Sequence, residues 1–292
     1  MAERQSQIVL GLDPDPAALW RAIGAGAGAG SPARRVAAAV REHCGALIEA
    51  AGGACVAVKL QLACFERLGA PGWEALGAVA EHARAAGLLV IADAKRGDIE
   101  VSARAYAQAL IGGLDTEAGR IAGLGADAVT VNPLLGEDSL EPWLASARRA
   151  GAGLFVLVRT SNPGAGEIQE LELRGGGAVW ERLASLVARI GADGVGGAGI
   201  SDVGAVVGAT APALLGRARE WMPHAPFLLP GVGAQGGRVG ELAPAFAPGP
   251  AGGLVAVSRA IANAHLTRGG EPASAARAEA ERLRELAWTL AS

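Results

Sequence analysis

Short apolar runs recur along the chain, and amphipathic stretches separate most of them. We predict strands at residues 8–12, 55–60, 88–92, 128–131, 154–158, 203–208, 226–229 and 253–257. Stretches such as 73–86 and 179–190 carry the apolar spacing of helices. Strands that alternate with helices predict a parallel sheet covered by helices. Eight such units predict an α/β fold, a single (β/α)8 TIM barrel spanning residues 1–292.

Two segments depart from minimal strand–helix spacing, and a third follows the last predicted strand. The alternating Gly and Ala residues at 24–30 predict a mobile surface loop. The stretch 161–202 is long for one strand-to-helix connection, although it carries a helix of its own. Residues 272–290 are rich in Ala, Glu and Arg and predict a terminal surface helix. None of these composition changes resembles a linker between domains.

Composition supports this fold class. Apolar residues make up 51% of the chain but aromatic residues only 4%, so aliphatic side chains must fill the core. That is typical of a parallel sheet covered on its faces. The formal charge of −3 gives the chain no excess of positive charge with which to bind nucleic acid or an anionic membrane. We therefore expect neither as a partner.

Cysteine and histidine usage bears on location and metal binding. The three cysteines and four histidines show no metal-ligand spacing, so we expect no zinc site. The N-terminus lacks the basic segment followed by an apolar run that is typical of a signal peptide. No apolar stretch is long enough for a membrane span. The cysteines are predicted to be reduced, buried small hydrophobes, and the protein is expected in the cytoplasm.

Polar residues follow nearly every predicted strand. In barrels of this kind the chemistry lies at the carboxyl ends of the strands, where such side chains gather. The polar residues at these ends are Asp13, Lys59, Asp93, Lys95, Asn132, Thr160, Ser161, Gln235, Ser258 and Arg259.

The most informative segment runs from an apolar strand directly into Asp93-Ala-Lys95-Arg-Gly-Asp98. Side chains alternate along a strand, so Asp93 and Lys95 should point to the same side, into the barrel mouth. Lys59 ends a neighbouring strand with an equally apolar approach. Charged groups in such places are costly unless they are paired. Separate salt bridges on the rim are one interpretation, but two lysines and two aspartates on neighbouring strands favour a functional cluster.

These residues resemble a known family. Asp93-Ala-Lys95-Arg-Gly-Asp98-Ile99 is similar to the D-x-K-x-x-D-I signature of orotidine 5'-phosphate decarboxylases, and Lys59 matches the family's first lysine. Five further motifs resemble its longer bacterial branch, and their order along the chain strengthens the resemblance. They are Gly11-Leu-Asp13-Pro-Asp-Pro, Thr130-Val-Asn-Pro-Leu-Leu-Gly136, Arg159-Thr-Ser-Asn-Pro-Gly-Ala165, Pro230-Gly-Val-Gly-Ala-Gln-Gly-Gly237 and Ser258-Arg-Ala-Ile261.

The resemblance implies decarboxylation of orotidine 5'-phosphate to UMP in pyrimidine biosynthesis, without metal or organic cofactor. A Lys–Asp–Lys–Asp network of Lys59, Asp93, Lys95 and Asp98 would stabilise and protonate a carbanion at C6. Lys95 would act as electrostatic stabiliser and then as general acid, and Asp93 would lie against the substrate carboxylate. Lys59 would pair with Asp93, and Asp13 would hold a ribose hydroxyl.

The resemblance also implies a homodimer with shared active sites. Asp98 and Ile99 would complete the site of the neighbouring subunit, with the Ser102 hydroxyl beside them. From sequence alone, Asp98 could instead be a helix N-cap in its own subunit.

The remaining substrate contacts are predicted at three strand ends. Gln235 in a Gly-rich turn, with Ser258 and Arg259, would bind the phosphate. Ser161 would hydrogen-bond the pyrimidine edge. The plainer alternative is that the Gly-rich segment and Thr160-Ser161-Asn-Pro are ordinary turns.

Two alternatives to this function remain. Metal-dependent relatives on the same barrel, such as hexulose-phosphate synthases, use magnesium and place a Glu ligand where this chain has Lys59. A binding-only or scaffold barrel would need the phosphate loop but no alternation of Lys and Asp. A dehydrogenase is disfavoured, because the Gly-rich turn near residue 231 comes late and lacks an acidic partner for the ribose.

Overall fold

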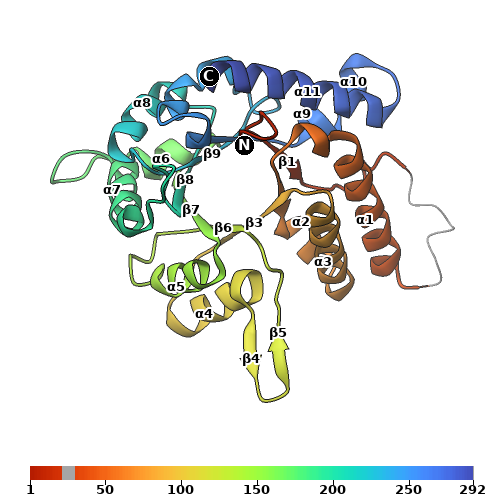
Figure 1. Cartoon of the computed structure of the whole chain (residues 1–292), viewed down its shortest axis with the longest axis horizontal. Coiled ribbons are helices and arrows are strands. Elements are labelled where there is room, and N and C mark those ends of the chain that lie inside the picture. The colour runs from red at the N-terminus through yellow and green to blue at the C-terminus, as the bar shows by residue number, and fades with distance from the viewer. Residues whose placement is uncertain (22–29, 292) are drawn as a thin grey trace.

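Eight parallel strands close into a barrel at the centre of the molecule (Figure 1). The structure is a computed structural model that describes residues 1–21 and 30–291. The strand order around the barrel is β1-β10-β9-β8-β7-β6-β3-β2. These strands are β1 (Ile8–Leu12), β2 (Ala57–Gln61), β3 (Leu89–Arg96), β6 (Ala128–Val131), β7 (Gly153–Arg159), β8 (Val203–Val207), β9 (Phe227–Pro230) and β10 (Gly253–Val257).

Helices surround the barrel and connect its strands (Figure 1). The longer ones are α1 (Pro32–Ala51), α3 (Ala70–Ala85), α4 (Glu100–Ala107), α5 (Glu141–Ala150), α7 (Val179–Gly191), α8 (Pro212–Trp221) and α11 (Pro272–Ala291). Shorter helical segments are α2 (Leu62–Glu66), α6 (Ala165–Gln169), α9 (Arg259–Ala262), α10 (Ala264–Arg268) and the π-helical turn η2 (Gln108–Gly112). Single 3-10 turns are η1 (Gly52–Ala54), η3 (Ala192–Gly194), η4 (Val239–Glu241), η5 (Ala243–Phe246) and η6 (Pro250–Gly252).

The predicted barrel is confirmed, and β1, β6 and β10 have the predicted bounds. Strand β3 is longer than predicted, because it resumes pairing with β6 at Arg96 after an irregularity that begins at Ala92. The long stretch 161–202 carries the two helices α6 and α7, and the terminal helix α11 lies where it was predicted. The predicted loop 24–30 lies outside the described residues, apart from Gly30.

One element was not predicted. The strands β4 (Leu114–Thr116) and β5 (Gly119–Ile121) form an antiparallel hairpin that projects outward beside α4 and α5 (Figure 1). All six of its paired residues are exposed. Strands of three residues are too short to show alternation, so no apolar pattern marks them.

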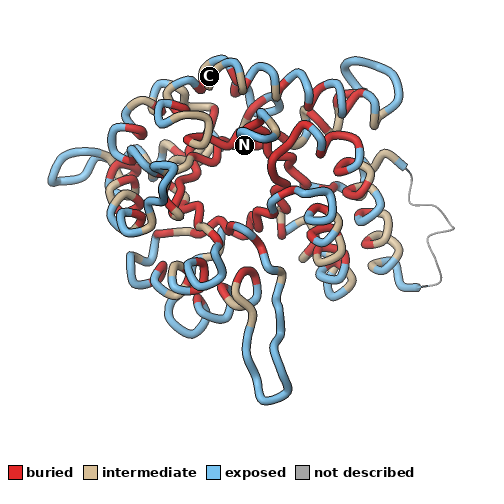
Figure 2. Tube along the Cα trace, in the orientation of Figure 1, coloured by how far each residue is buried: buried red, intermediate tan, exposed pale blue. Residues whose placement is uncertain are grey.

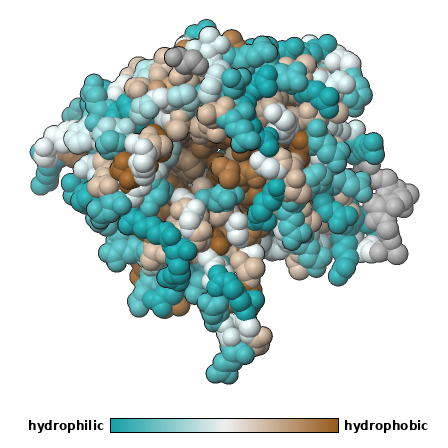
Figure 3. All heavy atoms as spheres, in the orientation of Figure 1, coloured by the Kyte–Doolittle hydropathy of each residue, from teal (hydrophilic) through white to brown (hydrophobic). Residues whose placement is uncertain are grey.

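The core has two layers because strand side chains alternate between the barrel interior and the helices. Ile8 and Leu10 belong to the layer under the helices, whereas Val9 packs inside the barrel with Ile91 and Phe155. Figure 2 shows the buried ring of strands and the buried inner faces of the helices. In Figure 3 hydrophobic residues gather around a hollow at the centre of the visible face, and hydrophilic residues dominate its periphery. Over the described ranges, no helix is long and apolar enough to cross a membrane.

Candidate active site

A cavity of about 350 Å3 lies at the carboxyl ends of the barrel strands. Residues from or after seven of the eight strands carry the polar groups that line it. The polar lining residues are Asp13, Lys59, Gln61, Asp93, Lys95, Thr130, Thr160, Ser161, Asn162, Gln235, Ser258 and Arg259. The structure therefore brings together most of the polar residues that the sequence predicted at this rim.

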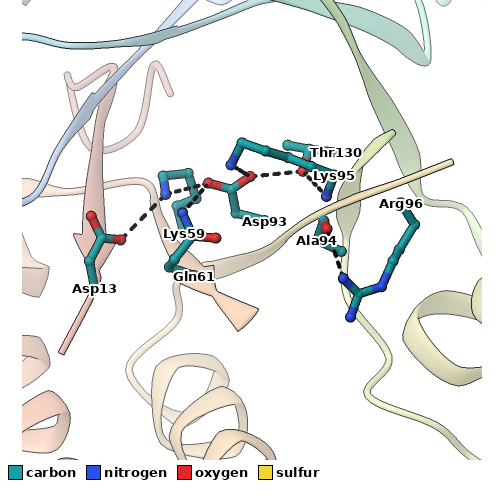
Figure 4. Close-up of polar contacts among 8 residues, drawn as sticks. All are labelled: Asp13, Lys59, Gln61, Asp93, Ala94, Lys95, Arg96 and Thr130. Carbon is teal, nitrogen blue, oxygen red and sulfur yellow. Dashed lines mark hydrogen bonds and ion pairs between the residues drawn. The ribbon is translucent and has the colours of Figure 1, made fainter. Parts of the chain in front are cut away.

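Four of these residues form a row of alternating charge (Figure 4). Lys59 Nζ lies 3.5 Å from Asp13 Oδ1 and 2.6 Å from Asp93 Oδ2. The ammonium of Lys95 contacts the other carboxylate oxygen, Asp93 Oδ1. Lys59 and Asp93 are buried, whereas the Lys95 side chain is 43% exposed and lines the cavity. The chain contains two lysines in all, and both belong to this row.

The row keeps its buried members ionised. Burial alone would raise the pKa of the Asp93 carboxyl, but the charges of Lys59 and Lys95 outweigh burial and hold that pKa well below its usual range. Burial alone would lower the pKa of Lys59, but the charges of Asp93 and Asp13 hold it above its usual value. At neutral pH the site thus presents a fixed carboxylate between two ammonium groups.

Sequence reasoning assigned no role to two further polar neighbours of Asp93. Thr130 is buried at the end of β6, and its hydroxyl donates to Asp93 Oδ1 over 2.8 Å. Gln61, at the end of β2, donates from Nε2 to Asp93 Oδ2 over 3.5 Å. Their place at strand ends was visible in the sequence, but their contact with Asp93 follows from the closed barrel.

The predicted phosphate residues line another part of the cavity. Gln235 belongs to the Gly-rich turn after β9, and Ser258 and Arg259 follow β10. Ser258 packs tightly on β1, because a Cβ added at Gly11 would lie 2.7 Å from the Ser258 Cβ. Glycine at this position is what allows β1 and the end of β10 to approach each other so closely.

Ser161 is held in place by its neighbours. Thr210 Oγ1 donates to the Ser161 carbonyl oxygen over 3.1 Å. The preceding residue, Thr160, donates its N–H to Gln169 Oε1 at the end of α6 over 2.8 Å. Helix α6, at the start of the long stretch 161–202, therefore supports the segment that carries Ser161.

Asp98, Ile99 and Ser102 lie apart from this cavity in the chain itself. They are not among the described residues that line it. Asp98 is also not the N-cap of the following helix: that position belongs to Ile99, whose N–H donates to Asp98 Oδ1 over 2.8 Å. The alternative that Asp98 is a helix N-cap in its own subunit was therefore wrong, since α4 begins at Glu100 with Ile99 as its N-cap.

Other parts of the molecule offer less chemistry. A larger cavity of about 720 Å3 is lined by residues of α1, α3 and the start of α11, with acidic and basic side chains intermixed. Within residues 1–21 and 30–291, no three His, Cys, Asp or Glu side chains are grouped so that they could hold a metal ion. The strand-end cavity is therefore the stronger candidate.

Comparison with known proteins decides the family. Residues 6–278 match the pattern of the orotidine 5'-phosphate decarboxylase / HUMPS family. The chain belongs to this family. Among curated relatives, it is 44% identical over 230 residues to the orotidine 5'-phosphate decarboxylase of Rhodopirellula baltica, covering 79% of this chain and 75% of the relative.

Solved structures of family members have the same fold. The OMP decarboxylase of Leishmania donovani aligns with a TM-score of 0.72 and 32% identity, over 98% of this chain and 96% of that one. The UMP synthase of the same organism aligns with a TM-score of 0.73 and 33% identity, over 98% of this chain but only 55% of the longer protein.

Proposed function

We propose that this protein decarboxylates orotidine 5'-phosphate to UMP in pyrimidine biosynthesis, without metal or organic cofactor. The observation that carries the proposal is the row Lys59–Asp93–Lys95 at the edge of the cavity, with one carboxylate held between two ammonium groups. Family membership and the named activity of relatives such as the Rhodopirellula baltica enzyme support it.

The chemistry requires a cation beside the reacting carbon. When the bond between C6 and the carboxylate breaks, CO2 leaves and its bonding electron pair remains on C6. The Lys95 ammonium stabilises that charge and then donates a proton to C6, which forms UMP. Water later returns the proton to the Lys95 amine. Asp93 faces the substrate carboxylate, and Lys59 keeps Asp93 ionised and in place.

Lys59 separates this reaction from that of magnesium-dependent relatives. Those enzymes resemble this chain on the third strand but carry a carboxylate ligand at the end of the second. Here the second strand β2 carries the ammonium of Lys59, which lies 2.6 Å from Asp93 and raises the cost of placing a cation there. A binding-only barrel would have no use for buried charges that are costly to maintain.

The other cavity residues fit the rest of the substrate. Arg259 and Ser258, with the Gly-rich turn that carries Gln235, bind the phosphate. Asp13 accepts a hydrogen bond from a ribose hydroxyl, and Ser161 bonds the pyrimidine edge. These roles rest on the family resemblance and on the position of each residue in the cavity lining.

The active unit in this proposal is a homodimer, in which Asp98 and Ile99 complete the partner's site with the Ser102 hydroxyl beside them. Exposed apolar side chains support it. Ile99 is 55% exposed and Val101 71%, and the neighbouring loop after β6 exposes Leu134 at 79%. Apolar side chains that are exposed on neighbouring segments often mark an interface. We also propose that residues 1–292 act as one domain; the cytoplasmic location stays a prediction.

Turnover tests the proposal directly. Purified protein mixed with orotidine 5'-phosphate should form UMP, followed by loss of the substrate's ultraviolet absorbance. Lys95→Ala should lower kcat by at least about 1000-fold, because one group supplies both charge stabilisation and the proton. Arg120→Ala, which removes an exposed ion pair in the β4–β5 hairpin, is the matched control and should leave turnover unchanged. Failure of the unmodified protein to form UMP would contradict the proposal.

A further inference from the structure

Thr130 is hydrogen-bonded to both Asp93 and Lys95, two members of the row of alternating charge. Its hydroxyl donates to Asp93 Oδ1 over 2.8 Å and accepts the backbone N–H of Lys95 over 2.9 Å. Only 1% of Thr130 is exposed, so water does not compete for these bonds. One hydroxyl thus contacts the carboxylate of one charged residue and the backbone of the other (Figure 4).

These bonds fall where the barrel ladder is irregular. Ala92 pairs with Val129 and Arg96 pairs with Val131, so three residues of β3 lie opposite the single residue Thr130. Extra residues of this kind leave backbone groups without ladder partners and redirect side chains. The Thr130 hydroxyl takes the place of a ladder acceptor for the Lys95 N–H.

The backbone at Lys95 needs such support. Its φ is +49°, in the left-handed region that residues with a Cβ seldom adopt. Such a conformation persists where the surroundings over-determine it, and it recurs at functional sites. The next residue, Arg96, has contacts of its own. Its side chain donates to the carbonyl oxygen of Ala94 over 3.2 Å and contacts Glu66, so Arg96 does not depend on Thr130.

We propose that Thr130 is a positioning residue, whose hydroxyl fixes the Lys95 backbone and the Asp93 carboxylate relative to each other. This inference rests on the proposed function, because it concerns the same charged row. Thr130 transfers no proton in the reaction. It sets where the Lys95 ammonium stands, and errors of about 1 Å in such a position can lower a rate about 100-fold.

The scarcity of lysine provides a test that does not require activity. In protein labelled with ¹⁵N-lysine, the two lysines give two backbone amide signals, which Lys95→Arg assigns. In Thr130→Val the hydroxyl is replaced by a methyl group of similar size. The Lys95 amide should then exchange with solvent about tenfold faster, because it has lost its acceptor. The Lys59 amide, on β2, should keep its exchange rate.

Kinetics test the catalytic consequence. Thr130→Val should lower kcat by about 10- to 100-fold while KM and the affinity for UMP change by less than about threefold. Thr130→Ser keeps the hydroxyl and should restore most of kcat. Ser201→Ala is the matched control. Ser201 also donates to a carbonyl oxygen (Gly191, 2.8 Å) and accepts a backbone N–H (Val203, 3.0 Å), but it does not line the proposed active site.

The outcomes separate this inference from the proposed function. An unchanged Lys95 amide in Thr130→Val would overturn the inference, whatever the activity. A faster amide with wild-type kcat would also overturn it, as would an equal loss of kcat in Thr130→Ser or Ser201→Ala. If the unmodified protein does not convert orotidine 5'-phosphate, the proposed function fails, and the amide exchange still decides whether Thr130 holds Lys95.

Discussion

Asp93 accepts bonds from several donors at once, and its environment decides its charge. It contacts Lys59, Lys95, Thr130 and, at 3.5 Å, Gln61. A buried carboxylate without partners would take up a proton. With these partners the pKa of Asp93 lies well below its usual range, although burial acts in the opposite direction. The ionised form is therefore part of the folded structure.

This lowered pKa makes stability depend on pH in a defined window. The unfolded pKa of an aspartate is about 3.9. Because the pKa of Asp93 is lower in the folded state, Asp93 stabilises the fold above that pH, and this stabilisation is lost as the pH falls toward the folded pKa. Below about pH 4, the wild type should lose up to about 1.4 kcal/mol more per pH unit than the double variant Lys59→Met/Asp93→Asn.

Denaturant unfolding at a series of pH values measures this difference. At about pH 7 the double variant should be as stable as the wild type to within about 2 kcal/mol, because removing both charges of a buried pair is often close to neutral. Parallel pH profiles for the two proteins would show that Asp93 does not have the lowered pKa described here.

The residues of the charged row differ in how far sequence could predict them. Asp93, Lys95 and Lys59 lie at the ends of apolar runs, where an unpaired charge would be costly. Their positions alone therefore indicated a functional cluster. Thr130 sits within an apolar run where threonine is an ordinary strand residue. Its role depends on the irregular pairing of β3 with β6, and such an irregularity between distant segments leaves no local pattern.

At the scale of elements, the strands were predictable and the hairpin was not. Eight apolar runs located every barrel strand. Parallel strands are buried on both faces, so their residues form nearly continuous apolar runs. The β4–β5 hairpin is exposed and short, so no burial pattern marks it. The alternative that made Asp98 the N-cap of α4 was wrong by one residue, since the exact start of a helix depends on capping geometry.

Close packing between elements gives a prediction at Gly11. A Cβ there would meet Ser258 Cβ at 2.7 Å, so Gly11→Ala should push the end of β10 away from β1. We expect a loss of about 1–3 kcal/mol in the free energy of unfolding. We also expect a raised KM for orotidine 5'-phosphate, because Ser258 and Arg259 move with that strand end.

Gly216→Ala in α8 is the control for this measurement. A Cβ at Gly216 has no neighbour within 4 Å, and the substitution should stabilise the helix by about 0.5–1 kcal/mol. If Gly11→Ala were as stable as Gly216→Ala and had an unchanged KM, the approach of β1 to Ser258 would have no bearing on the site.

At the scale of the whole molecule, part of the proposed site is missing from a single chain. Asp98, Ile99 and Ser102 do not line the described cavity, and Ile99 presents an apolar side chain to solvent. Sequence could suggest these residues through the family motif. It could not place them, because a contact between two copies is not a property of one chain's pattern.

Mixing two inactive variants tests the shared site. If Asp98 acts in the partner's site, Lys95→Ala and Asp98→Ala chains that re-associate at random should recover about a quarter of wild-type activity, since half the dimers are mixed and each has one intact site. The two variants measured separately serve as the baseline. No recovery in a mixture shown to contain mixed dimers would mean that both residues serve the same subunit's site.

The central claim is that the charged row performs the decarboxylation without a metal ion. The measurement that tests it most directly is kcat for orotidine 5'-phosphate in metal-stripped protein with excess EDTA, compared with the same protein after magnesium is added. Because Lys59 and Lys95 supply the positive charge, we predict the same kcat in both, within about twofold. Activity that disappears with EDTA and returns with magnesium would contradict the account.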